Sequence, residues 1–264
     1  MGYHVFRAVF RARLAAVAAG VTVAVLGLAG TATAGAATSA SRAGIPIVYT
    51  KGTAGYWDGH GIATLFRFVG ATVPVAACQP ASIIPKKADN ANAMIALLGA
   101  AAPQEAELAV SCGGGSGSIT YFDNGTNGVI NLAPSVGDVL RISVYREVKA
   151  LKDQYTVTDT TTGVTRQLTI STATHGVMFH YAELGSVINN AGIASRPVLT
   201  TRLWVFKDCN VTTYGGVHGT ILGPWPTYRF WDTTDGTASG ASVMYPTYPS
   251  DNGSHFGTWL VSSH

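Results

Sequence analysis

One continuous stretch predicts a tight turn followed by a strand: Ser135-Val136-Gly137-Asp138-Val139-Leu140-Arg141-Ile142-Ser143-Val144. The glycine supplies the positive φ that a tight turn requires, and the aspartate hydrogen-bonds to the local backbone. Beyond the turn an apolar residue recurs at every second position, as in a strand with one buried face. Asp159-Thr160-Thr161-Thr162-Gly163 is a second turn of this kind between two threonine-rich runs. The stretch predicts antiparallel strands joined by short turns.

Short runs rich in Val, Ile, Thr, Tyr and Phe recur along the whole chain between clusters of Gly, Asn, Asp and Pro. Strands at this spacing predict an all-β fold, either an antiparallel β-sandwich or a barrel. Residues 145–154 resemble a helix, and a charged hairpin connection explains them equally well. The predicted strands are 62–69, 93–98, 107–112, 119–122, 129–132, 139–145, 155–159, 165–170, 177–184, 202–206, 219–222, 228–231 and 256–261.

The first residues have the three parts of a secretory signal peptide. Arg7, Arg11 and Arg13 precede the uncharged run 14–29, and Ala32-Thr33-Ala34 offers the small residues that a signal peptidase needs. A retained membrane anchor is the alternative, but the run has 16 residues and crossing a bilayer takes ~20. We therefore expect a secreted, extracellular protein that keeps no stable membrane anchor.

This organisation makes the mature chain electrically neutral. We expect a signal peptide over 1–34, a flexible lead-in over 35–44 and one β-sandwich domain over 45–264. The full sequence has 17 Lys and Arg against 14 Asp and Glu, and removing 1–34 removes three arginines and no acid. A neutral chain in which 12% of residues are charged argues against nucleic acid or an anionic membrane as a partner. We expect a monomer.

The three cysteines, Cys78, Cys112 and Cys209, allow one disulfide and one free thiol in an oxidising compartment. Which two pair is open. No Cys-x-x-Cys spacing is present, and His175 and His180 fall on opposite faces of a strand. We therefore expect no metal site and no cofactor.

Acidic residues are few, and most stand in turns. Asp123, Asp138 and Asp159 lie beside Gly, Asn or Thr, where an aspartate usually accepts hydrogen bonds from the local backbone. Glu105 falls in a predicted loop. Glu107 and Glu183 differ, because each falls in a strand-like apolar run. These two carboxylates are the candidates for chemistry, and the alternative for each is an ordinary solvent-facing strand residue.

Strand alternation predicts which side chains share a face with them. In 177–184 it places Phe179, Tyr181 and Glu183 together. In 107–112 the apolar residues take one face and leave Glu107 on the other. Both carboxylates can thus point away from the core towards a shared, aromatic-lined groove.

Several motifs follow one another in an order that resembles the secreted glutamic peptidases, the eqolisins. They are Gly137-Asp138, the turn at 159–163, the run 175–184 and Trp204-Val205-Phe206-Lys207-Asp208-Cys209-Asn210-Val211, and the resemblance covers roughly residues 93–222. It implies a concanavalin-A-like jelly roll of two sheets and a polypeptide substrate.

The resemblance also implies site residues. The family's glutamate lies in an Ala-Glu-Trp motif, which Ala182-Glu183-Leu184 matches except for the tryptophan. Glu107 best matches the family's catalytic glutamine, with Gln104 a poorer second. Tyr121 and Phe122 remain of the aromatic residues that line the family's substrate cleft, and we add Tyr181 and Phe179 as substrate-binding candidates.

Replacement of glutamine by Glu107 changes which group can donate a proton. In the family mechanism the glutamate takes a proton from the attacking water, and the glutamine amide donates to the developing oxyanion. An ionised Glu107 can only accept and would repel the oxyanion, whereas a protonated Glu107 can donate. Two nearby carboxylates cannot easily both ionise. The resemblance therefore predicts an endopeptidase that acts in acid, or one with weak or lost activity, inactive near neutral pH.

The aromatic-rich C-terminal part suggests a different function. Trp225, Tyr228, Phe230, Trp231, Tyr245, Tyr248, Phe256 and Trp259 stand among Pro, Gly and Asp. Flat rings beside hydrogen-bonding groups suit sugar faces, so a secreted carbohydrate- or surface-binding module without catalysis is the alternative. Roles in the core and on edge strands explain the same rings.

Overall fold

The computed structural model describes residues 44–50, 53–58, 65–79, 91–99, 104–112, 117–171, 178–188, 198–199, 203–234, 236–240 and 242–260. The predicted signal peptide and nearly all of the predicted lead-in lie outside these ranges. Within them the chain is all-β, with one short 3₁₀ turn at Asp251–Gly253 and no α-helix. None of the described segments is a helix long and apolar enough to cross a membrane. The predicted all-β class is confirmed.

The strands form one continuous hydrogen-bonded path that folds back on itself into two packed layers. The first layer contains β3 (Phe66–Pro74), β9 (Val139–Glu147), β10 (Lys152–Asp159), β11 (Thr165–Ser171), β14 (Leu203–Thr213), β17 (Ser242–Pro246) and β18 (Phe256–Leu260). The second contains β2 (Thr53–Asp58), β5 (Ala91–Gly99), β6 (Glu105–Val110), β7 (Ile119–Asp123), β8 (Thr126–Val129), β12 (Phe179–Ile188) and β16 (Thr227–Thr233). Three short pairings complete the arrangement: β1 (Ile47–Thr50) with β16, β15 (His218–Gly219) with β14, and β13 (Val198–Leu199) with β4 (Cys78–Gln79).

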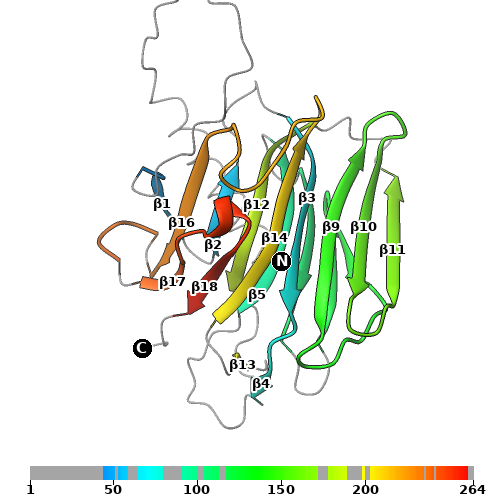
Figure 1. The fold of residues 1–264 in the computed structure, drawn as a ribbon, viewed down its shortest axis with the longest axis horizontal. Coiled ribbons are helices and arrows are strands. Elements are labelled where there is room, and N and C mark those ends of the chain that lie inside the picture. Colours follow the sequence, from blue (N-terminus) through cyan, green and yellow to red (C-terminus); the bar gives the residue numbers. More distant parts are fainter. Residues whose placement is uncertain are drawn as a thin grey trace, which may run out of the picture.

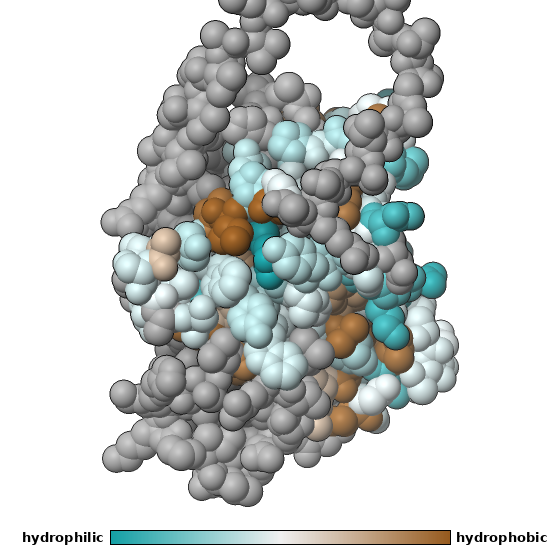
Figure 2. Space-filling model, turned by 60° about the vertical axis from the view of Figure 1, so that its left-hand side comes forward, coloured by the Kyte–Doolittle hydropathy of each residue, from teal (hydrophilic) through white to brown (hydrophobic). Residues whose placement is uncertain are grey.

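Figure 1 shows the strands side by side across the molecule, from β1 and β16 on the left to β11 on the right. The side that carries β1 and β16 comes forward in Figure 2, where weakly polar side chains surround a hydrophobic patch. The sparse charge of the sequence is thus visible on this side.

The main core fills the space between the layers. In β9 the side chains of Leu140, Ile142 and Val144 are fully buried, whereas the intervening positions are more exposed. This is the alternation that the sequence predicts. The stretch 145–154 is a charged hairpin connection between β9 and β10, so its helical interpretation is wrong. The alternation of β9 runs on to Arg146, which leaves only a short turn before β10.

The two quoted turns have the conformations expected of them. Gly137 has φ 92° and Gly163 has φ 75°, values that favour glycine. The Ser135 amide donates to Asp138 Oδ2 at 2.7 Å, and the Thr161 amide donates to Asp159 Oδ1 at 2.9 Å. The strand predicted over 129–132 is wrong in position, because β8 ends at Val129.

Cys209 is not part of a disulfide and is buried in the main core. This leaves Cys78 and Cys112 as the pair available for the expected disulfide.

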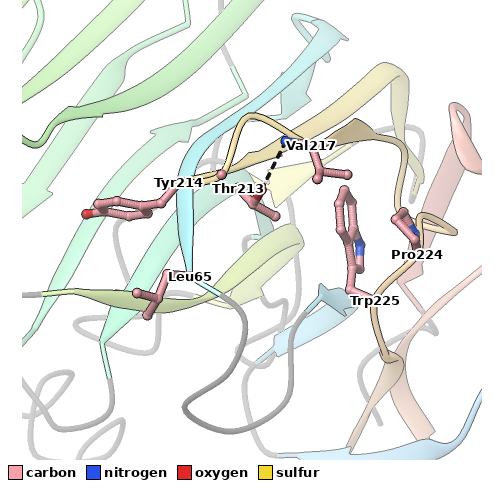
Figure 3. Close-up of a pocket in the computed structure, with 7 residues that line it drawn as sticks. Leu65, Thr213, Tyr214, Val217, Pro224 and Trp225 are labelled. Atoms are coloured by element: carbon pink, nitrogen blue, oxygen red, sulfur yellow. Dashed lines mark hydrogen bonds between the residues drawn. The ribbon is translucent and has the colours of Figure 1, made fainter. Parts of the chain in front are cut away.

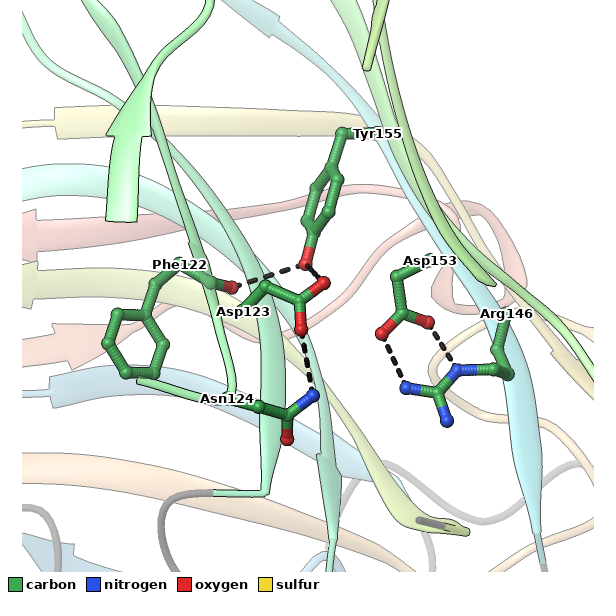
Figure 4. A network of polar contacts seen from close by, with 6 residues as sticks. All are labelled: Phe122, Asp123, Asn124, Arg146, Asp153 and Tyr155. Carbon is green, nitrogen blue, oxygen red and sulfur yellow. Dashed lines mark hydrogen bonds and ion pairs between the residues drawn. The ribbon is translucent and has the colours of Figure 1, made fainter. Parts of the chain in front are cut away.

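A buried polar network joins the two layers at one end of the core (Figure 4). Arg146 of β9 donates through Nε and Nη2 to the two carboxylate oxygens of Asp153 on β10. On the same layer, the Tyr155 hydroxyl donates across the core to Asp123 Oδ2 of β7 at 2.8 Å. Asp123 also accepts from Asn124 Nδ2 at 2.7 Å. The prediction that Asp123 serves only its local turn is therefore wrong, since its carboxylate ties β7 to β10.

One proton decides the charge of this network. Burial raises the pKa of Asp153 to about 6, the guanidinium of Arg146 opposes the rise, and Asp123 adds to it. Burial also raises the pKa of Tyr155, so its hydroxyl keeps its proton. One arginine beside two aspartates is electrically balanced when one carboxyl stays protonated, which is the cheaper state in a low dielectric.

We expect Asp153 to make folding more favourable in acid. Its folded-state pKa lies above the unfolded value, so its contribution is complete below about pH 4 and is lost as the pH rises through about 6. Asp153→Asn resembles the protonated form and loses this dependence. Relative to wild type, its free energy of unfolding should rise by about 3 kcal/mol between pH 4 and pH 7.

Urea unfolding at both pH values measures this difference. Asp208→Asn is the matched control, because Asp208 is exposed and its difference from wild type should not change with pH. A pH-independent difference for Asp153→Asn would contradict the assignment.

Candidate functional site

Glu183 and Glu107 lie in one cross-strand row of the second layer. Glu183 of β12 pairs with Ala96 of β5, and Ala96 pairs with Glu107 of β6. The row continues to Phe122 of β7. Directly paired residues of neighbouring strands share a face, so the two carboxylates project from the same side of the sheet.

Both carboxylates are on the side away from the main core. Their strand neighbours Ala182, Leu184 and Leu108 belong to the main core, so Glu183 and Glu107 point the opposite way. On that side Ala96, Leu98 and Phe230 form a second, smaller cluster, with Val48, Tyr181 and Tyr228 packed against it. We call this side of β6, β5, β12, β2 and β16 the site face.

Small residues lie beside Glu183 on part of the site face, and Trp57 of β2 pairs with it on the remaining side. Ala96 is the only residue between Glu183 and Glu107 in the row, so the two α-carbons are two strand spacings apart, roughly 10 Å. Gly185 and Gly55 follow at the next position of β12 and β2 and pair with each other. A Cβ on Gly55 would lie 2.2 Å from the Leu184 carbonyl oxygen. No side chain fits there, so the glycines allow the backbones of β2 and β12 to pack closely at this point.

Sequence reasoning missed a third carboxylate. The loop predicted for Glu105 is wrong, because Glu105 opens β6 and shares the site face with Glu107, two residues away. The exposed fractions are 2% for Glu105, 6% for Glu107 and 5% for Glu183. The apolar alternation of β6, traced back two residues, is the signal that could have found it. The solvent-facing alternative for Glu107 and Glu183 does not fit side chains this buried.

Two of the predicted substrate-binding residues lie on the other side of the sheet. The register of β12 shifts between Phe179 and Tyr181, so strict alternation fails there. As a result Phe179 is fully buried in the main core, with Arg146 Cζ 4.4 Å from its ring centre. Tyr121 also packs on the main core, 5.6 Å from the Tyr155 ring. The face predicted for Phe179, and a shared face for Tyr121, are therefore wrong.

Tyr181 and Phe122 lie on the site face with the carboxylates. Phe122 pairs with Glu107, and Tyr181 packs on the smaller cluster. Gln104, the poorer match to the family's glutamine, precedes β6 and is half-buried.

The two tyrosines of the site face stay protonated over a wide pH range. Burial raises the pKa of Tyr181, and the nearby Tyr228 adds to the rise. Burial also raises the pKa of Tyr228. Both hydroxyls are therefore neutral hydrogen-bond donors on the same side of the sheet as Glu183.

A pocket of about 400 Å³ lies elsewhere, near the hairpin between β14 and β15. In Figure 3, Trp225 and Val217 line one side of it and Leu65 and Tyr214 the other. None of the site-face carboxylates lines it. Among the described residues no three His, Cys, Asp or Glu side chains converge as metal ligands do.

Solved structures of glutamic peptidases have a similar fold. Scytalido-glutamic peptidase, bound to a transition-state analogue inhibitor, aligns with a TM-score of 0.59 and 17% identity over 81% of this chain and 98% of its own. SCP-B, a member of the eqolisin family in complex with the tripeptide Ala-Ile-His, aligns with a TM-score of 0.55 and 19% identity over the same shares. No protein-family model and no curated protein matches the sequence. The β-sandwich fold of the glutamic peptidases, implied by the sequence resemblance, is thus confirmed.

Proposed function

We propose that this chain, which has the fold of the glutamic peptidases, is a secreted endopeptidase that acts in acid and is weak near neutral pH. Glu183 is the general base and polypeptide is the substrate. One observation carries the proposal: Glu183 and Glu107 are buried on the same face in one row, with only an alanine between them. This spacing leaves room for a water molecule between the two carboxylates.

The chemistry follows from the proton that each group holds. The ionised Glu183 takes a proton from the water as the water attacks the peptide carbonyl carbon. Glu107 assists only while it carries its own proton, because an ionised carboxylate repels the negative oxygen that develops. Activity therefore depends on a pH low enough to keep one proton on the pair.

Glu183→Gln should abolish cleavage of a denatured protein between pH 2 and 5. An amide cannot accept the proton of the water, and loss of a general base lowers kcat by about 10²- to 10⁴-fold. Peptide release, followed by mass spectrometry, measures it. Glu147→Gln, an exposed carboxylate of β9, is the control and should cleave like wild type. Equal cleavage by wild type and Glu183→Gln would remove Glu183 from the mechanism.

Glu107→Gln should extend activity towards neutral pH. The substitution replaces a carboxylate with the neutral amide that the glutamic peptidases use, so no charge opposes the oxyanion above the pH at which Glu107 ionises. We expect kcat/KM at pH 6 to 7 to rise at least tenfold over wild type, with little change at pH 3. A pH profile that does not move would argue against a place for Glu107 beside the reacting carbonyl.

A second candidate function is supported by the exposed aromatic side chains. Trp231 and Tyr245 stack with ring centres 5.2 Å apart. Tyr248 is 55% exposed and Trp259 39% exposed. Exposed rings of this kind suit sugar faces, so a carbohydrate-binding module without catalysis is the alternative.

If the alternative holds, the wild-type protein is retained on an insoluble polysaccharide and a Tyr248→Ala/Trp259→Ala variant is not. Val129→Ala, at another exposed hydrophobic residue, is the control and should bind like wild type. A pull-down over a panel of polysaccharides measures retention, and no retention of the wild type on any of them counts against this function.

A further inference from the structure

The proposed reaction needs a hydrogen-bond donor for the oxyanion, and this chain has no glutamine amide at the position where the glutamic peptidases have one. The oxygen of the attacked carbonyl becomes negative, and peptidases stabilise it with preorganised hydrogen-bond donors. The best match to the family's glutamine is Glu107, which is no donor once it ionises. A neutral donor on the site face would remove this difficulty. The inference that follows deepens the proposed function and rests on it.

Tyr181 is on the same strand as Glu183, two residues before it. The register shift of β12 lies between Phe179 and Tyr181, so Tyr181 has left the main core and faces the same way as Glu183. Side chains two apart on one strand are neighbours on one face of the sheet. The side chain of Tyr181 is thus a neighbour, on the same face, of the carboxylate that would activate the water.

Tyr228 approaches from the opposite direction. It pairs with Trp57 of β2, and Trp57 pairs with Glu183, so Tyr228 and Glu107 lie at equal strand distances on either side of Glu183. Tyr228 and Tyr181 pack on the same small cluster, and each is only half-buried, unlike its fully buried members Ala96 and Phe230. Half-buried hydroxyls can reach a ligand, whereas the buried apolar members serve packing.

We propose that the hydroxyl groups of Tyr181 and Tyr228 form the oxyanion site, donating hydrogen bonds to the substrate carbonyl oxygen as it becomes negative. Both donors are neutral and are held by the sheet, so little reorganisation is needed at the moment of reaction. The tyrosines thereby supply neutral donors that an ionised Glu107 cannot, while activity still requires the proton held by the carboxylate pair.

Hydrolysis of the peptide bond at this site needs water as its only co-reactant. The water oxygen bonds to the carbonyl carbon, one water proton passes to Glu183, and the carbonyl π-electron pair moves to the oxygen that Tyr181 and Tyr228 contact. When the C–N bond breaks, the proton on Glu183 passes to the leaving nitrogen and the oxygen regains its double bond. The tyrosines keep their protons throughout.

The test compares Tyr181→Phe, Tyr228→Phe and the double variant with wild type. Phenylalanine keeps the ring packing and removes only the donor. We expect kcat to fall about 10- to 100-fold in each single variant and further in the double variant, in line with the loss of an oxyanion donor. KM should stay within about twofold, because the neutral ground-state carbonyl depends less on these donors. Tyr145→Phe, in the other layer, is the matched control with wild-type kinetics.

A binding measurement keeps the inference separate from the proposed activity. A phosphinic peptide carries tetrahedral, negative oxygens like those of the transition state, and calorimetry compares it with a substrate-like peptide of the same sequence. We expect the double variant to lose at least tenfold in affinity for the phosphinic peptide and little for the other.

Each outcome decides something different. If the wild type cleaves and the tyrosine variants cleave equally well, the oxyanion assignment is wrong and the peptidase function stands. If the wild type cleaves nothing but binds the phosphinic peptide through the tyrosines, the function fails and the oxyanion site stands. If it neither cleaves nor binds that peptide, both are overturned.

Discussion

The hydrogen bond from Tyr155 to Asp123 crosses the core and holds the two layers together at one end. The Tyr155 hydroxyl also lies 3.3 Å from the backbone oxygen of Phe122, which accepts from it. The tyrosine of β10 therefore contacts two neighbouring residues of β7. Phe122 pairs with Glu107, and Glu107 shares its row with Glu183. The position of the site face therefore depends on a polar contact on the far side of the same sheet.

Buried carboxyl groups occur both in the polar network between the layers and on the site face. The network of Arg146, Asp153 and Asp123 has one carboxylate more than it has cations, and it is most favourable when Asp153 keeps its proton. The site face holds Glu107 and Glu183, each less than a tenth exposed. Carboxyl groups withdrawn from water favour their protonated forms unless cations or donors compensate them. A fold with these two features suits an acidic environment, which agrees with the proposed acid activity.

The register shift in β12 separates a residue of the main core from residues of the site face within one strand. Before it, Phe179 packs in the main core under the guanidinium of Arg146. After it, Tyr181 and Glu183 turn to the site face. An irregularity of this kind redirects side chains without ending the strand. The strand thereby contributes to the buried network on one side of the sheet and to the candidate chemistry on the other.

The sequence by itself determined the all-β class, the turns at Gly137 and Gly163, and the choice of Glu107 and Glu183, because alternation and turn chemistry are local properties. It misplaced Phe179, since nothing in the local pattern marks the register shift that changes its face. It also assigned Asp123 to a turn and Glu105 to a loop. Only the tertiary structure decided these roles, because a carboxylate acquires its partners and its burial from strands distant in the chain: β10 for Asp123, and for Glu105 the neighbouring strands of the site face. Pairing across the sheet, and not spacing along the chain, brings Glu107 and Glu183 into one row.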